Sequence, residues 1–175
     1  MSSTKNPVLL GEAPKGTQGF AFDWNAWTTM RFAEAVGFNA RFIFKYFRPL
    51  NLLDDRQETG TNSYDAFDHQ RAVQNVGLKI AAGDRVICVG SRVTRAVSEY
   101  FGINVQYSSR FIPMCSWGDL IEGNQFAQIP HPANPAGRQS YRRGLPAQPK
   151  VAISFLIATV RERYSDAFQH RLDTE

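Results

Sequence analysis

Three polar side chains stand within or just after short apolar runs of the chain, and they are the first candidates for chemistry: Glu12 and His131 after such runs, and Asn51 inside one. His131 lies between two prolines, whose rings restrict the backbone and help to position a catalytic donor. The amide of Asn51 offers a hydrogen-bond donor and an acceptor together, the pattern that matches the edge of a nucleobase. Glu12 puts a carboxylate directly after a predicted buried strand, where α/β proteins bind ligands.

Each of these residues also has a structural interpretation. Glu12 could cap N–H groups of a surface loop, and a single histidine is more often structural than catalytic. A buried amide such as that of Asn51 needs partners and could bridge to a neighbouring loop. Phe20 and Phe22 lie in the glycine-containing loop after the first apolar run, where they could close over the core or form a stacking platform for a base. The residue types alone leave both interpretations open.

The elements that must position these residues follow from apolar runs and helical periodicity. Strands alternate with helices, which predicts an α/β protein, a three-layer α/β/α sandwich around a central, mainly parallel four-stranded sheet. In such a sheet every strand ends at the same edge, so Glu12, Asn51 and His131 are expected to lie together. The predicted strands are residues 8–10, 50–53, 85–90 and 126–129, and the predicted helices are residues 23–37, 64–82, 91–101 and 151–172.

Length and composition indicate one globular domain over residues 1–175, with 43% apolar residues and no apolar run long enough for a membrane span. The polar N-terminal segment shows no secretory signal. Only two cysteines occur, Cys88 and Cys115, which favours a reducing compartment and excludes a four-cysteine zinc or iron–sulfur site. We expect an intracellular monomer without cofactor or membrane contact, in the cytoplasm or nucleoid, or in the host cytoplasm if the protein is viral.

Other motifs point to no competing chemistry. Gly11 and Gly16 resemble half of a phosphate-binding loop, but Lys15 precedes the second glycine instead of following it. Ser91 follows the third predicted strand without the second glycine of a nucleophile elbow, and we interpret it as a helix cap. The three histidines are too scattered for the spacing of metal ligands, and we assign no role to His69 or His170.

A basic segment near the C-terminal helix predicts an anionic partner. Residues 131–150 contain four cationic side chains and no acid, so this segment alone carries a charge equal to the +4 of the whole chain. Nucleic acid is the commonest partner of such a segment, and a solvated basic loop is the alternative. The cationic residues are Arg138, Arg142, Arg143 and Lys150.

Five short motifs together resemble the uracil-DNA glycosylase superfamily, in family order over roughly residues 8–143. Gly-Glu-Ala-Pro at residues 11–14 resembles the signature of the iron–sulfur branch, and Phe22 resembles the phenylalanine of its Pro-Phe-Val-Gly segment. Asn51 within Leu-Asn-Leu-Leu resembles the asparagine that recognises the base. Residues 86–93 resemble the third strand with its following turn, and residues 129–134 resemble the His-Pro-Ser/Ala motif before the DNA-inserting loop.

The chain also departs from that branch. Lys15 stands where the branch has a glycine, and the Glu-Asp pair further on is missing. The cysteines that would hold an iron–sulfur cluster are absent, so no cluster is implied. Residues 134–137, Asn-Pro-Ala-Gly, differ from the usual insertion loop. The substrate base could therefore differ from uracil, or the activity could be lost.

The resemblance implies a DNA glycosylase acting on uracil or a modified pyrimidine that is flipped out of single- or double-stranded DNA. It implies catalytic roles for Glu12, which orients water, and His131, a neutral donor to the leaving base. It implies base binding by Gly11, Phe22 and Asn51, and DNA binding by Arg138, Gln139, Tyr141, Arg142 and Arg143. Two alternatives stay open: an inactive DNA-binding protein with the same fold, and a hydrolase of free nucleosides or nucleotides.

Overall fold

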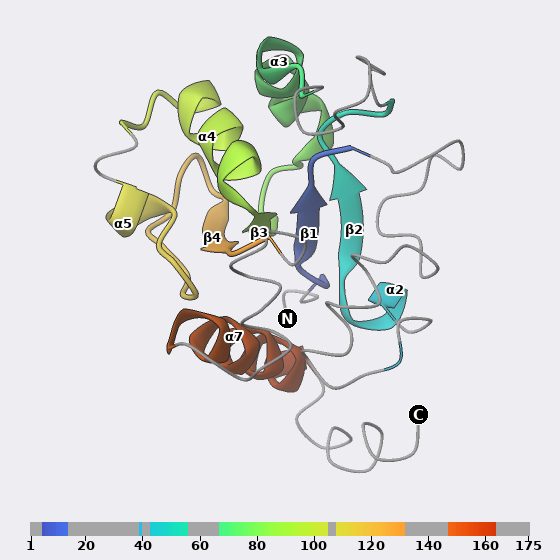
Figure 1. The fold of residues 1–175 in the computed structure, drawn as a ribbon, viewed down its shortest axis with the longest axis vertical. Helices are drawn as coiled ribbons and strands as arrows, with labels where there is room; N and C mark the ends of the chain where they lie inside the picture. The colour runs from blue at the N-terminus through green and yellow to red at the C-terminus, as the bar shows by residue number, and fades with distance from the viewer. Residues whose placement is uncertain are drawn as a thin grey trace.

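The computed structural model describes residues 5–13, 39, 43–55, 67–104, 108–131 and 147–163 of the chain. Four strands form one sheet with the order β2-β1-β3-β4, and all neighbouring strands are parallel (Figure 1). This sheet, with its helices, confirms the predicted α/β class. The strands are β1 (Val8–Gly11), β2 (Arg48–Asn51), β3 (Arg85–Val89) and β4 (Gln125–Ile129).

The central strands are apolar throughout because both faces of the sheet are covered. Alternate residues of a strand point to opposite faces, and the two faces contribute to two separate clusters of buried side chains. Leu9 and Ile87 belong to one cluster, whereas Leu10 and Cys88 belong to the other. A continuous apolar run, without the alternation of a half-exposed strand, is the expected pattern for such a sheet.

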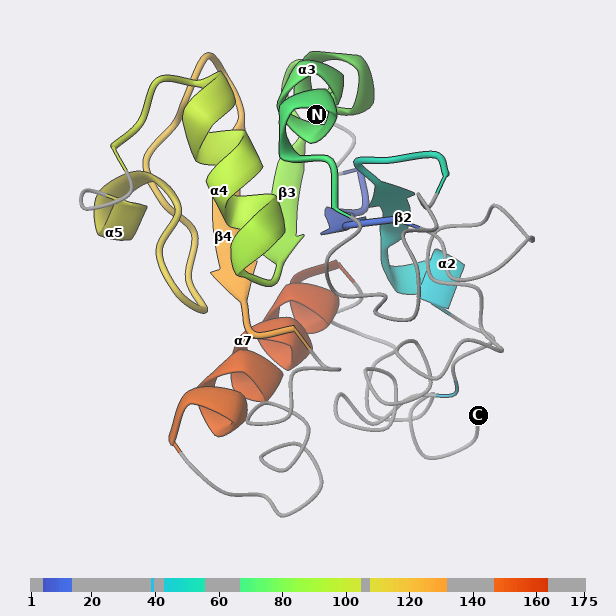
Figure 2. The ribbon, with the colours of Figure 1, turned by 45° about the horizontal axis from the view of Figure 1, so that its top comes forward.

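Helices lie on both sides of the sheet, as Figure 2 shows, with α3 and α4 on one side and α7 on the other. Helix α3 (His69–Lys79) and helix α4 (Ser91–Tyr100) bury residues such as Val76 and Val97 in the cluster that contains Leu10. Helix α7 (Ala147–Arg163) buries Ala152, Leu156 and Val160, spaced four residues apart, in the cluster that contains Leu9. Two short helices complete the described elements: α2 (Ile43–Tyr46) and α5 (Ser108–Phe111).

The second strand begins two residues earlier than predicted and ends at Asn51. Arg48 and Pro49 did not fit an apolar strand, because arginine is polar and proline cannot donate a ladder hydrogen bond. Both are accommodated since β2 lies at the edge of the described sheet, with β1 as its one neighbour there. Leu52 and Leu53 are buried after the strand, and Asn51 is therefore its last residue rather than a residue in its middle.

The helix boundaries show two further differences. Helix α3 begins at His69 rather than residue 64, because Asp68 caps it by accepting a hydrogen bond from the backbone N–H of Arg71 at 3.1 Å. The prediction that Ser91 caps α4 is wrong: Gly90 is the N-cap, with φ of +89°, and Ser91 is the first helical residue. A left-handed φ at this turn requires glycine.

The end of α4 agrees with the prediction, since Gly102 follows it with φ of +66°. The predicted helix over residues 23–37 lies outside the described residues, whereas α7 begins at Ala147, four residues earlier than predicted. None of the helices that the structure describes is long and apolar enough to cross a membrane.

Candidate functional site

Three of the predicted residues lie at the carboxyl edge of the sheet. Glu12 follows the last residue of β1, Asn51 ends β2, and His131 lies two residues after β4. All four strands are parallel, so these positions share one edge. From β1 the chain connects to β2, which lies on one side of β1, and it then crosses to β3, which lies on the other side. The connections from β1 and from β3 therefore run in opposite directions along the sheet. The point between two such strands is called a switch point, and open α/β sheets bind ligands there.

Glu12 and Asn51 are joined through the backbone of their two strands. Gly11 pairs with Asn51 in the parallel register, and the N–H of Leu53 donates to the carbonyl oxygen of Glu12 at 2.9 Å. Gly11 is buried, while Glu12 and Asn51 are half-buried. Gly11, the residue before Glu12, and Asn51 thus stand side by side on adjacent strands, about 4.8 Å apart at the backbone.

His131 lies against the end of β3 rather than above its own strand alone. A Cβ added at Gly90 would meet the Cβ of His131 at 3.0 Å and its Cδ2 at 3.3 Å. The N–H of Gly90 also donates to the carbonyl oxygen of Ile129 at 2.9 Å, which ties the ends of β3 and β4 together. Glycine at position 90 is therefore needed twice, for its positive φ and for the approach of the imidazole.

The spacing of the strands sets the width of this site. Asn51 ends β2, and the imidazole of His131 lies at the end of β3, which is two strands away in the sheet. Two strand spacings amount to about 10 Å between backbone positions. Glu12, at the end of β1, stands between them.

Arg92 is a member of this edge that the sequence analysis missed. Its Nη1 lies 3.6 Å from Oε2 of Glu12, and its guanidinium lies over the ring of Phe67, 5.8 Å from the ring centroid. Arg92 is the second residue of α4, so the helix that begins at Gly90 carries it to the edge. The turn that contains Gly90 was a sequence signal for a functional position nearby. The ion pair of Arg92 with Glu12 joins residues 80 positions apart, so no local sequence pattern predicts it.

The cysteines are not candidates for a nucleophile or ligand at this site. Cys88 is fully buried within β3, and burial raises the pKa of its thiol far above the usual range. Burial also raises the pKa of Cys115 to about 11. Both thiols therefore stay protonated at neutral pH. Within the described ranges, no three His, Cys, Asp or Glu side chains are grouped so that they could hold a metal ion.

The remaining predicted site residues cannot be placed on this edge from the structure. Phe22, the predicted stacking residue, lies outside the described residues, and so do residues 132–146 of the basic segment, whereas Lys150 lies within α7. The predicted DNA-binding residues in that segment are Arg138, Gln139, Tyr141, Arg142 and Arg143. The structure thus places Glu12, Asn51 and His131 at one edge of the sheet, and the predicted aromatic and basic contacts stay expectations.

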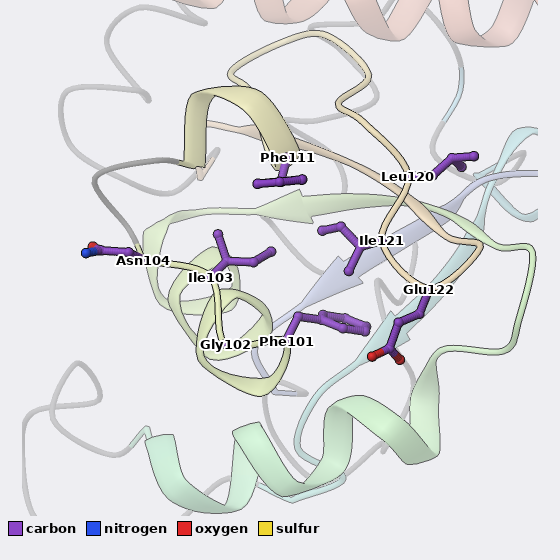
Figure 3. Close-up of a pocket in the computed structure, with 8 residues that line it drawn as sticks. All are labelled: Phe101, Gly102, Ile103, Asn104, Phe111, Leu120, Ile121 and Glu122. Carbon is purple, nitrogen blue, oxygen red and sulfur yellow. The ribbon is translucent and has the colours of Figure 1, made fainter.

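A separate hollow of about 610 Å³ lies at the opposite end of α4, away from Glu12 and His131 (Figure 3). It is lined by the segment that follows α4, by Phe111 of α5 and by the turn before β4. Apolar side chains predominate in it, and Figure 3 shows Phe101, Phe111 and Ile121 converging on the space between them. Glu122 is the acidic residue of its lining. This hollow combines no carboxylate with an imidazole, unlike the carboxyl edge.

The carboxyl edge offers a carboxylate, an amide, an imidazole and a guanidinium on four different segments of the chain. Such a set can hold a planar polar molecule, orient water beside it and donate a hydrogen bond to a leaving group. Comparison with family models, curated proteins and solved structures finds no match to this chain.

Proposed function

We propose that the protein is a DNA glycosylase that hydrolyses the N-glycosidic bond of uracil or a modified pyrimidine flipped out of DNA. The observation that carries this proposal is the position of Glu12, Asn51 and His131 at one edge of a parallel sheet, on either side of its switch point. The motif resemblance of the same three residues supports it independently of their geometry.

Recognition of the base would begin with its removal from the helix. A base stacked in a duplex is out of reach of this edge, so the nucleotide must rotate outward, which costs a few kcal/mol. Asn51, the last residue of β2, would bind the Watson–Crick edge through its amide. Phe22 would stack on the face of the base. The same amide discriminates between bases, because a base with the wrong donor and acceptor order leaves it unpaired.

Hydrolysis separates charge, and two side chains would stabilise that charge. As the bond from C1′ to the base nitrogen breaks, its electron pair leaves with the base and the sugar becomes cationic. The carboxylate of Glu12 would stabilise the sugar cation and orient the water whose oxygen attacks C1′. Neutral His131 would donate a hydrogen bond to the base oxygen on which negative charge accumulates. The proton released by water balances the charge of the departing base.

Affinity for DNA would come from the basic segment. Arg138, Arg142 and Arg143 would contact phosphates, which makes binding weaken as salt concentration rises. Gln139 or Tyr141 would fill the gap that the extruded base leaves. These contacts position the strand without recognising its sequence.

The decisive experiment is a single-turnover assay on oligonucleotides that carry uracil or a modified pyrimidine, single- and double-stranded, with abasic sites detected by alkaline cleavage. Glu12→Gln and His131→Ala should each slow base release by about 10²–10⁴-fold. The affinity for the same oligonucleotide should stay within about threefold, because neither side chain is expected to hold phosphate.

Two matched variants control for general damage. Glu122→Gln removes an exposed carboxylate from the turn before β4, and His69→Gln removes an imidazole from the start of α3. Both should release base at the wild-type rate. Absence of base release from every oligonucleotide would refute the proposal. Salt-dependent DNA binding would then indicate the inactive DNA-binding protein, and turnover of free nucleosides would indicate the small-molecule hydrolase.

A further inference from the structure

We propose that Arg92 is a positioning residue, which holds the carboxylate of Glu12 in the orientation required for hydrolysis. The proposal rests on the proposed function. It starts from the ion pair between Nη1 of Arg92 and Oε2 of Glu12, 3.6 Å apart, which joins the first turn of α4 to the end of β1. This pair spans the switch point of the sheet, between the ends of β1 and β3.

The position of Arg92 is restricted from two directions. The carbonyl oxygen of Gly90, its helix cap, accepts hydrogen bonds from the N–H and the hydroxyl of Thr94, at 3.2 and 2.9 Å, which fixes the first turn of α4. The guanidinium lies over the ring of Phe67, 5.8 Å from its centroid. A guanidinium is planar and stacks on aromatic rings, so it can contact the ring and still direct an N–H group at the carboxylate.

The exposure of the pair argues for a role in chemistry rather than in folding. The side chain of Arg92 is 36% exposed and that of Glu12 is 28% exposed. Ion pairs of such exposure add little to the stability of a protein, because water screens them and the two long side chains lose freedom. The same pair removes alternative rotamers of Glu12, and a misplaced catalytic group is costly to the reaction rate.

The charge of Arg92 would also matter for the substrate. A carboxylate at the binding edge repels the phosphates of DNA, and a neighbouring cation reduces that repulsion. Arg92 acts beside Glu12 in this effect and needs no contact with the base.

Three variants test the proposal in the full-length protein: Arg92→Met, Arg92→Lys and the control Arg95→Met, which removes an exposed arginine from the same helix. Arg92→Met should slow single-turnover base release by about 10²-fold. DNA affinity should change less than about threefold, since the residue is not expected to hold phosphate. Arg92→Lys should recover part of the rate because it keeps the charge without the planar fork. Arg95→Met should match the wild type.

A double variant separates action through Glu12 from direct action on DNA. In the Glu12→Gln background, Arg92→Met should cause no further loss of rate, because the carboxylate that it positions is gone. An equal loss in both backgrounds would overturn the proposal. So would a loss of DNA affinity as large as the loss of rate, which would make Arg92 a phosphate contact instead.

A measurement without substrate keeps this test distinct from that of the proposed function. Carbodiimide coupling of an amine to exposed carboxylates, read by mass spectrometry, reports how freely Glu12 reacts. Labelling of Glu12 should rise in Arg92→Met and stay unchanged in Arg95→Met. Unchanged labelling in both would overturn the positioning role. Failure of the wild type to release any base would refute the glycosidase function while leaving this measurement of the pair intact.

Discussion

Each of the two edges of the sheet holds a carboxylate paired with an arginine, and the two carboxylates differ in how deeply they are buried. At the amino edge, Asp84 is only 2% exposed, and its carboxylate accepts hydrogen bonds from Arg48 at 2.8 Å and from the N–H of Ala81 at 3.0 Å. At the carboxyl edge, the side chain of Glu12 is 28% exposed and its arginine lies 3.6 Å away.

The difference in burial separates a structural carboxylate from one that a substrate could reach. Asp84 stands before β3, and its N–H donates to the side-chain oxygen of Asn124, which precedes β4. Arg48 begins β2, so this network joins the starts of three strands. A carboxylate enclosed in this way is unavailable to substrate. Glu12 is exposed enough for a water molecule and a ligand to reach its carboxylate.

Removal of the amino-edge carboxylate should produce the largest loss of stability. Asp84→Ala leaves the guanidinium of Arg48 without its partner, and losing one member of a buried pair costs about 3–5 kcal/mol. Because Arg48 is partly exposed, we expect the lower end of this range, measured by urea denaturation. Asp119→Ala is the matched control, since Asp119 pairs with Arg110 at the surface. A loss of less than about 1 kcal/mol for Asp84→Ala would contradict the structural role.

Substitution of Gly90 should affect the carboxyl edge more than the fold. Gly90→Ala places a Cβ 3.0 Å from the Cβ of His131 and imposes a left-handed φ of +89° on alanine, which costs about 1–2 kcal/mol. Base release should also fall by about 10²-fold, because the imidazole is displaced.

Gly83→Ala provides the comparison for this variant. Gly83 has φ of +82° and no atom within 4 Å of an added Cβ, so alanine there bears the conformational cost without a clash. Gly90→Ala should lose at least as much stability as Gly83→Ala, and only Gly90→Ala should lose activity. Equal activity of the two would show that His131 does not depend on the space at Gly90.

The smallest effect is expected for an exposed ion pair at the amino edge. Arg85 begins β3, and its Nη1 lies 2.9 Å from Oε2 of Glu162 on α7. Glu162→Gln should lower the free energy of unfolding by less than about 1 kcal/mol, and the difference should shrink in high salt. Thermal denaturation at low and high ionic strength measures both quantities. A loss as large as that of Asp84→Ala would mean that exposure does not distinguish these pairs.

The sequence predicted the sheet better than it predicted the contacts at its edges. The apolar runs at β1 and β3 and the mainly apolar run at β4 are local signals, and they correctly placed Glu12 and His131 at one edge. The start of β2 was missed because Arg48 and Pro49 are tolerated only through the position of β2 in the sheet. The pairing of Arg92 with Glu12 and that of Arg48 with Asp84 depend on the folding of distant segments, which no local pattern encodes.

The strand order has a consequence for altering the preference of this protein for its substrate. Asn51 ends an outer strand of the described sheet, which bonds to one neighbour, whereas Glu12 follows an inner strand that bonds to two. Replacements around Asn51 disturb fewer interstrand bonds than replacements around Glu12. Under the proposed glycosylase function, a library that randomises the end of β2 would therefore explore new base specificities while Glu12, after its inner strand, is left unchanged.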